Sequence, residues 1–142
     1  MPKMRQGRVD RDELPATIRR SDEHAQRIFA ESHDSAMQQY RDEARAHQVA
    51  YAALKHSYER VGDRWEQKAH PGPSDSRAEH GGGSDDAPTA GGVDARASKS
   101  HLMEVARRLN VRGRSRMNKA DLVTAIQRAN DRASRRSDSS GG

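Results

Sequence analysis

The amino-acid sequence predicts a mainly α-helical protein with two small helical units joined by a flexible segment. Hydrophobic residues make up 32% of the 142 residues and charged residues 33%, which leaves too little apolar surface for one large core. All five aromatic residues precede position 70, whereas residues 71–97 are rich in Gly, Pro, Ser and Asp. We therefore expect a larger core in the first half of the chain and a small aliphatic core near its end.

Three helices are expected before position 70. Residues 14–20 should form a short helix, because it starts at a Leu-Pro pair and proline suits a first helical turn. Ser21 is the expected N-cap of a second helix over 21–40, where apolar residues recur every three or four positions. The same periodicity predicts a third helix over 42–60, with Gly62 as its C-terminal stop.

Trp65 lies beyond the third helix, and we expect it to cover the helix pair from a short extended segment. Residues 8–70 also carry a series of short motifs. The motifs are Asp12-Glu13-Leu14-Pro15, His24-Ala25-Gln26-Arg27-Ile28-Phe29, Ser35-Ala36, Gln39-Tyr40, Ala46-His47-Gln48-Val49-Ala50-Tyr51-Ala52-Ala53-Leu54-Lys55-His56-Ser57-Tyr58 and Trp65. In this order they resemble the ChaB family. The resemblance implies a small helical domain with no known catalytic residues and with a protein partner. Members of the family are described as cation transport regulators, and baculovirus relatives are associated with DNA.

Residues 71–97 are typical of a flexible linker. The segment has a net charge of −3 and almost no large apolar side chains, so burial cannot offset the entropy of ordering it. Such a linker would let two units bind their partners at the same time. Residues 131–142 are also polar, and we expect them to form a disordered tail.

Residues 98–130 predict a helix, a basic turn and a second helix. Ser100 should cap the first helix, and Asn118 the second, with Asp121 in a capping-box position. The segment is similar to the Rho termination factor N-terminal motif and, more distantly, to the SAP motif, which implies a helix-extended-helix nucleic-acid-binding module. The residues that carry this similarity are Leu102, Ala106, Leu109, Val111, Met117, Asn118, Lys119, Leu122 and Ile126.

Most of the positive charge lies in this last part of the chain. Residues 98–142 carry a net charge of +7, whereas the whole chain carries +5. Arg112, Arg114 and Arg116 alternate in an expected extended stretch, so their side chains should point to one side and contact phosphates. Lys119 and the first N–H groups of the next helix would add to this site. A solvated loop is the alternative, and the sequence does not separate DNA from RNA.

The sequence argues against catalysis, metal binding and a bound cofactor. It has no Cys, and its Asp, Glu and Ser residues form no arrangement typical of a catalytic site. The histidines at 24, 33, 47 and 56 are nine to fourteen residues apart, which predicts packed or surface side chains, although two or three of them could converge across the helix pair. No apolar run approaches the roughly 20 residues of a membrane span, and no signal peptide is evident, so we expect a cytoplasmic protein.

These observations predict a non-enzymatic accessory or regulatory protein. In the main interpretation it binds DNA or RNA phosphates through Arg112, Arg114, Arg116 and Lys119, while the ChaB-like unit engages a second partner. The alternative, implied by the ChaB resemblance, is a protein-interaction regulator of a cation transporter. A third possibility is a stress-response or phage-derived accessory protein whose basic end binds RNA nonspecifically.

Overall fold

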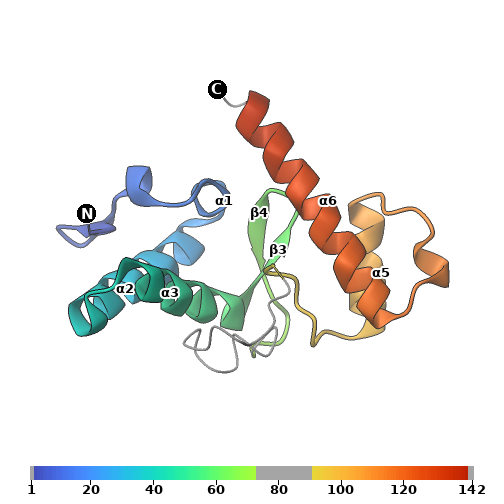
Figure 1. Cartoon of the computed structure of the whole chain (residues 1–142), viewed down its shortest axis with the longest axis horizontal. Coiled ribbons are helices and arrows are strands. Elements are labelled where there is room, and N and C mark those ends of the chain that lie inside the picture. Colours follow the sequence, from blue (N-terminus) through green and yellow to red (C-terminus); the bar gives the residue numbers. More distant parts are fainter. Residues whose placement is uncertain (1, 73–90, 141–142) are drawn as a thin grey trace.

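The computed structural model describes residues 2–72 and 91–140, and it is mainly α-helical, as predicted (Figure 1). A helix pair lies at one end of the molecule, a β-hairpin in the middle and a second helix pair at the other end. In chain order the elements are β1 (Met4–Arg5), β2 (Arg8–Val9), the 3-10 turn η1 (Arg11–Glu13), α1 (Ala16–Arg19), α2 (Glu23–Tyr40), α3 (Glu43–Ser57), β3 (Tyr58–Val61), β4 (Arg64–Gln67), α5 (Lys99–Arg108), the 3-10 turn η2 (Arg114–Arg116) and α6 (Lys119–Ser140).

The first helix pair, α2 and α3, is capped by aspartates. Asp22 accepts a hydrogen bond from the N–H of Ala25 at 2.8 Å, so the N-cap lies one residue after the expected Ser21. Asp42 caps α3 in the same way. Asp satisfies the free N–H groups of a first helical turn and adds a negative charge at the positive end of the helix, which explains why it is preferred here.

The core of this first half lies between α1, α2, α3 and the hairpin. Trp65 is only 5% exposed and packs over the helix pair, as predicted. The buried members of this core are Leu14, Ile18, Ala25, Phe29, Ala30, Ala50, Leu54, Tyr58 and Trp65.

The third helix is shorter than predicted, because α3 ends at Ser57 and the chain continues as a β-hairpin. β3 pairs antiparallel with β4, with Tyr58 opposite Gln67 and Val61 opposite Arg64. Gly62 therefore does not stop a helix but begins the hairpin turn, where its φ of +70° favours glycine. Apolar residues at 51, 54, 58 and 61 fit a helical period, but pairing with β4 and packing on two sides override that local preference.

The second helix pair, α5 and α6, does not form its core alone. Val61 from the hairpin and Val93 from the segment before α5 are buried in it together with residues of both helices. The helical members are Leu102, Val105, Ala106, Leu122, Ile126 and Ala129, and Val111 joins them from the connection. The two units that the sequence predicts are thus packed against each other.

Part of the expected linker is ordered. The carbonyl oxygen of Gly92 accepts a hydrogen bond from the N–H of Arg60 at 2.9 Å, and Val93 is buried. Residues 91–97 therefore return to the hairpin instead of forming a free linker, because they complete the hydrogen bonding of β3 and its apolar cover. Residues 73–90 of the predicted linker lie outside the described residues.

The C-terminal helix is longer than predicted. We expected a disordered tail over 131–142, but α6 continues to Ser140, and 141–142 lie outside the described residues. The side of α6 that faces the hairpin carries residues 126, 130, 133 and 137, which follow a helical period. Contacts between the tail and residues elsewhere in the chain therefore keep the tail helical. No helix in the described ranges is long and apolar enough to cross a membrane.

Gly92 gives a direct test of this packing. A Cβ atom at this position would lie 2.5 Å from Cη2 of Trp65 and 2.9 Å from Cβ of Arg60, and φ is +93°. We expect Gly92→Ala to lower the free energy of unfolding by about 1–3 kcal/mol beyond the cost of the positive φ. Gly7→Ala is the matched control, because Gly7 has φ +77° and no atom within 4 Å of its Cβ position. Equal losses in the two variants, measured by chemical denaturation, would contradict this packing.

Candidate interaction site

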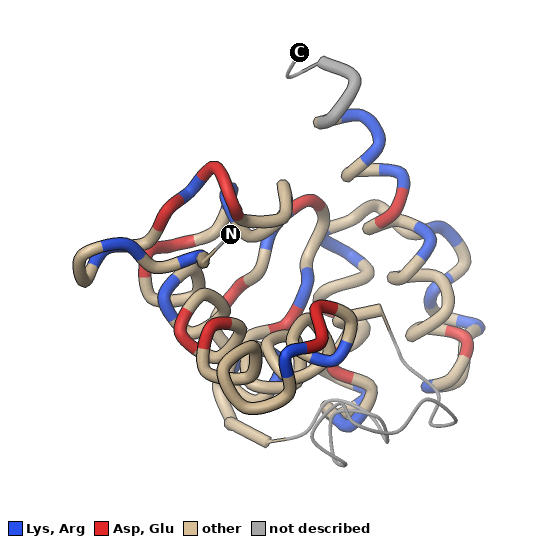
Figure 2. The backbone as a smooth tube through the Cα atoms, turned by 60° about the vertical axis from the view of Figure 1, so that its left-hand side comes forward, with Lys and Arg blue, Asp and Glu red and all other residues tan. Residues whose placement is uncertain are grey.

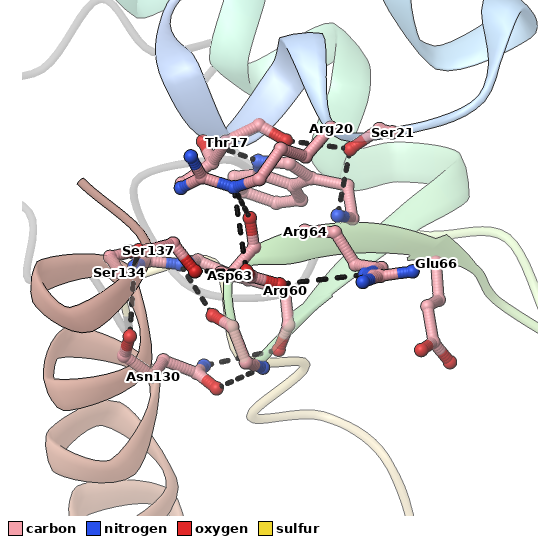
Figure 3. Close-up of polar contacts among 12 residues, drawn as sticks. Thr17, Arg20, Ser21, Arg60, Asp63, Arg64, Glu66, Asn130, Ser134 and Ser137 are labelled. Carbon is pink, nitrogen blue, oxygen red and sulfur yellow. Dashed lines mark hydrogen bonds and ion pairs between the residues drawn. The ribbon is translucent and has the colours of Figure 1, made fainter. Parts of the chain in front are cut away.

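A polar junction joins the hairpin to α1 on one side and to α6 on the other (Figure 3). Asn130 of α6 lies at its centre and is 1% exposed. Its Oδ1 accepts a hydrogen bond from the N–H of Gly62 at 2.6 Å, and its Nδ2 donates to the carbonyl of Arg60 at 3.1 Å. The amide side chain thus satisfies one backbone group of β3 and one of the hairpin turn that would otherwise lack these partners.

Arg60 links the hairpin to the next turn of α6. Its Nη2 donates to the carbonyl of Asn130 at 3.2 Å and to the hydroxyl of Ser134, and its Nη1 lies 3.7 Å from Asp131. Burial lowers the pKa of Arg60, and the negative charge of Asp131 opposes that shift. A guanidinium with several acceptors in place is well suited to such a half-buried joint.

Asp63, in the hairpin turn, connects both flanking helices. Its carboxylate accepts a hydrogen bond from the hydroxyl of Ser137 and lies 3.5 Å from Nε of Arg20. The same Nε donates to the carbonyl of Asp63 at 2.9 Å. The hydrogen bond from Ser137, assisted by Arg20, lowers the pKa of Asp63 although burial opposes it.

Trp65 fixes the other side of the hairpin to α1. Its backbone N–H donates to Oγ of Ser21 at 2.8 Å, and Ser21 donates in turn to the carbonyl of Thr17 at 2.8 Å. The indole N–H donates to Oγ1 of Thr17 at 3.2 Å. Ser21, which the sequence predicts as a helix cap, therefore acts as a bridge between α1 and β4.

A third contact attaches α5 to the hairpin. Both terminal nitrogens of Arg108 donate to the carboxylate of Glu66, at 2.8 and 2.7 Å, and His101 lies 2.9 Å from Glu59. The hydrogen bonds from Arg108 lower the pKa of Glu66. The charge of Arg108 is thus paired with Glu66 within the molecule. The net charge of the chain therefore overstates the positive charge that is free to bind a partner.

The four predicted phosphate-binding residues do not share the expected geometry. Residues 114–116 form the 3-10 turn η2 and not an extended stretch, because Gly113 reverses the chain just before it, so the argument from alternating side chains was wrong. Arg114 is half-buried, and its Nη1 donates to the carbonyl of Val111 at 3.1 Å. Arg112, Arg116 and Lys119 are exposed.

The start of α6 is organised as predicted. Asn118 Oδ1 accepts a hydrogen bond from the N–H of Asp121 at 2.8 Å, and Asp121 accepts one from the N–H of Asn118 at 3.3 Å. This reciprocal capping box confirms the predicted helix start. At the start of α5, in contrast, Ser98 is the cap, two residues before the predicted Ser100.

A second group of cations lies on α6. Arg128, Arg132 and Arg135 are exposed on α6 at i, i+4 and i+7, so they share one side of the helix. Basic residues recur along this helix in Figure 2. Arg132 and Arg135 lie in the segment that was expected to be disordered, so only the continuation of α6 aligns them with Arg128. Lys119 lies nine residues before Arg128, half a turn around the helix, so the two groups face different ways.

The histidines of the first half are also arranged in a way that their spacing does not show. His33 of α2 and His47 of α3 lie beside Glu43, with their potential ligand atoms within 4.8 Å of one another. His33 is 1% exposed and stacks on Phe29. His24, in contrast, lies 3.1 Å from the Tyr58 hydroxyl and outside this group.

Comparison with known proteins agrees with the motifs of the first half. The ChaB family model matches residues 14–68. The ChaB-matching segment contains α1, α2, α3 and the β3–β4 hairpin, and it ends where the chain leaves the hairpin. No curated protein and no solved structure matches the chain. The predicted similarity of residues 98–130 to the Rho and SAP motifs has no support from these comparisons.

The junction predicts a stability effect at Asn130. Asn130→Ala would leave the buried N–H of Gly62 and the carbonyl of Arg60 without their partner. We expect the free energy of unfolding to fall by about 1–3 kcal/mol. Thr124→Ala, on an exposed position of the same helix, should change it by less than about 0.5 kcal/mol. If Asn130→Ala is as mild as this control, the hairpin is not held by α6.

Proposed function

We propose that this protein is a non-enzymatic regulator that acts by contacting another protein through its ChaB-matching segment. The family match over residues 14–68 carries this proposal. The ChaB resemblance implies a cation transporter as the class of partner. We assign no catalytic residue and no cofactor to this function.

The end of the α2–α3 pair is the best candidate for the contact. Tyr40, at the end of α2, is 38% exposed, and the guanidinium of Arg45 lies 4.0 Å above its ring. Tyrosine and arginine are enriched in protein interfaces, because each combines a large apolar area with directed polar groups. This tip lies at the opposite end of the molecule from α5 and α6 (Figure 1), so a partner can reach it without disturbing the junction.

A flux assay tests the proposal. The full-length protein, added to inverted membrane vesicles that contain a cation antiporter, should change the rate of ion exchange. Tyr40→Ala should raise the concentration needed for a half-maximal effect about tenfold, a typical result for truncating a central interface tyrosine. Gln38→Ala, also exposed on α2, should behave like the unmodified protein. No change in flux with the unmodified protein would reject this function.

Nucleic-acid binding is a second candidate function, favoured by the exposed cations at the end of the chain. Arg112, Arg116 and Lys119 have no ion pair or side-chain hydrogen bond among the described residues, so their charges are available for phosphates. The stripe of Arg128, Arg132 and Arg135 adds charge on another side of α6. Backbone contacts of this kind suit DNA and RNA alike.

The dependence of affinity on salt tests this second candidate. Replacing Arg112, Arg116 and Lys119 together by Ala should reduce the slope of log K against log salt by about 2–3, if each side chain contacts one phosphate. Arg114→Ala should change the slope less, because that guanidinium is bonded to Val111. Lys99→Ala is the control for an exposed lysine elsewhere. Fluorescence anisotropy with labelled DNA and RNA that shows an unchanged slope in the triple variant would refute the assignment.

A further inference from the structure

We propose that His33, Glu43 and His47 form a binding site for a divalent transition-metal ion, with Zn²⁺ the best match, between α2 and α3. Oε1 of Glu43 lies 2.8 Å from Nε2 of His33 and 3.2 Å from Nδ1 of His47. One carboxylate oxygen thus faces a nitrogen of each imidazole. The three side chains come from the facing sides of two helices, where a single ion would touch all of them.

The surroundings of His33 point to a cation more strongly than the cluster itself. Its second ring nitrogen, Nδ1, lies 3.2 Å from Oδ1 of Asp34. Asp34 is fixed by the backbone N–H groups of Lys3, at 2.8 and 3.1 Å, and of Met4, at 2.8 Å. A buried imidazole that is held by a well-anchored carboxylate on one nitrogen is the usual support of a metal-bound histidine.

The hydrogen-bonding capacity of the His33 ring is compatible with a bound metal ion. A neutral imidazole has one N–H, so it can donate to Asp34 or to Glu43 but not to both. With the proton on Nδ1 donated to Asp34, the lone pair of Nε2 points toward the Glu43 carboxylate at 2.8 Å, and a metal ion in this position would be coordinated by both atoms.

The donor set selects the class of metal. Two imidazoles and one carboxylate suit Zn²⁺ and its neighbours among the transition metals, whereas Ca²⁺ and Mg²⁺ prefer six or more oxygen ligands. Ligand atoms about 2.0–2.1 Å from a tetrahedral ion lie roughly 3.3 Å from one another. The 2.8 and 3.2 Å distances from Glu43 are close to this separation, and the two histidine nitrogens, which lie within 4.8 Å of each other, would have to approach on binding. The side chain of Glu43 is 56% exposed and that of His47 is 38% exposed, which leaves room for this movement and for a water as fourth ligand.

A bound ion would act on the first helix pair and on the N-terminus together. It would cross-link α2 to α3 close to their connection, and Asp34 would transmit the restraint to the β1 strand through Lys3 and Met4. Binding to the folded state alone also raises stability in proportion to the logarithm of the free metal concentration. This inference does not depend on either proposed function.

Calorimetric titration of the metal-free, full-length protein with ZnCl₂ tests the proposal. We expect one ion per chain at this site, and we expect Co²⁺ to give the visible absorption of a four-coordinate ion. His47→Gln and Glu43→Gln should each weaken Zn²⁺ binding at least about tenfold, and Asp34→Asn about 10–100-fold through its effect on His33. His56→Gln, exposed on the same helix and outside the cluster, is the matched control and should bind like the unmodified protein.

Circular dichroism of each variant shows whether its fold is kept. The substituted side chains are exposed or half-exposed, so we expect the variants to fold. The proposal is overturned if Zn²⁺ does not bind, if His47→Gln binds as tightly as the unmodified protein, or if His56→Gln loses as much affinity as His47→Gln. Equal binding of Mg²⁺ and Zn²⁺ would also overturn it, because the imidazoles would then contribute nothing. In any of these cases the polar contacts of His33 with Asp34 and Glu43 serve only the packing of α2 against α3.

Discussion

The β3–β4 hairpin is the element on which the rest of the structure depends, because it is shared by both hydrophobic cores. Tyr58 and Trp65 are buried in the core of the ChaB-matching segment, whereas Val61 is buried with α5 and α6. A four-residue strand cannot be stable alone, and each helix pair covers only part of this hairpin. The side-chain amide of Asn130 in α6 accepts a hydrogen bond from the backbone of Gly62 in the hairpin turn. This contact links the second helix pair to the hairpin.

This sharing changes how the protein can act. Two units on a flexible linker would search for their partners independently, with only a loose limit on their separation. In the structure the α2–α3 tip at Tyr40 and the basic turn around Arg116 instead lie at opposite ends of one packed assembly (Figure 1). For a partner bound at one end of the protein, the other end therefore lies at a fixed distance and in a fixed orientation. Contacts of α6 with Arg60 and Asp63 maintain that geometry.

Local signals in the sequence predicted the parts that local interactions determine. The helix over 14–20, the second helix over 21–40 and the capping box at Asn118 follow from short-range periodicity and capping, and the structure contains all three within a few residues. The extended segment at Trp65 was expected and corresponds to β4, but β3 was not expected, because Tyr58 and Val61 continue the period of the preceding helix. Only the pairing with β4 decides between helix and strand there. The site formed by His33 and His47 could not be predicted for the same reason, since fourteen residues separate its histidines along the chain and only the packing of α2 against α3 brings them together.

Native-state hydrogen exchange measures most directly whether the shared hairpin makes the two halves one cooperative unit. The amides to compare are those of Phe29 and Leu54 in the first core, Leu122 and Ile126 in the second, and Gly62 between them. If the hairpin unites the cores, the slowest amides of both halves exchange with the same free energy of opening, and a destabilising change at Asn130 lowers all of them together. If the amides of α6 open at a clearly lower free energy while those of α2 and α3 stay protected, the second helix pair is a separate unit and the account is contradicted.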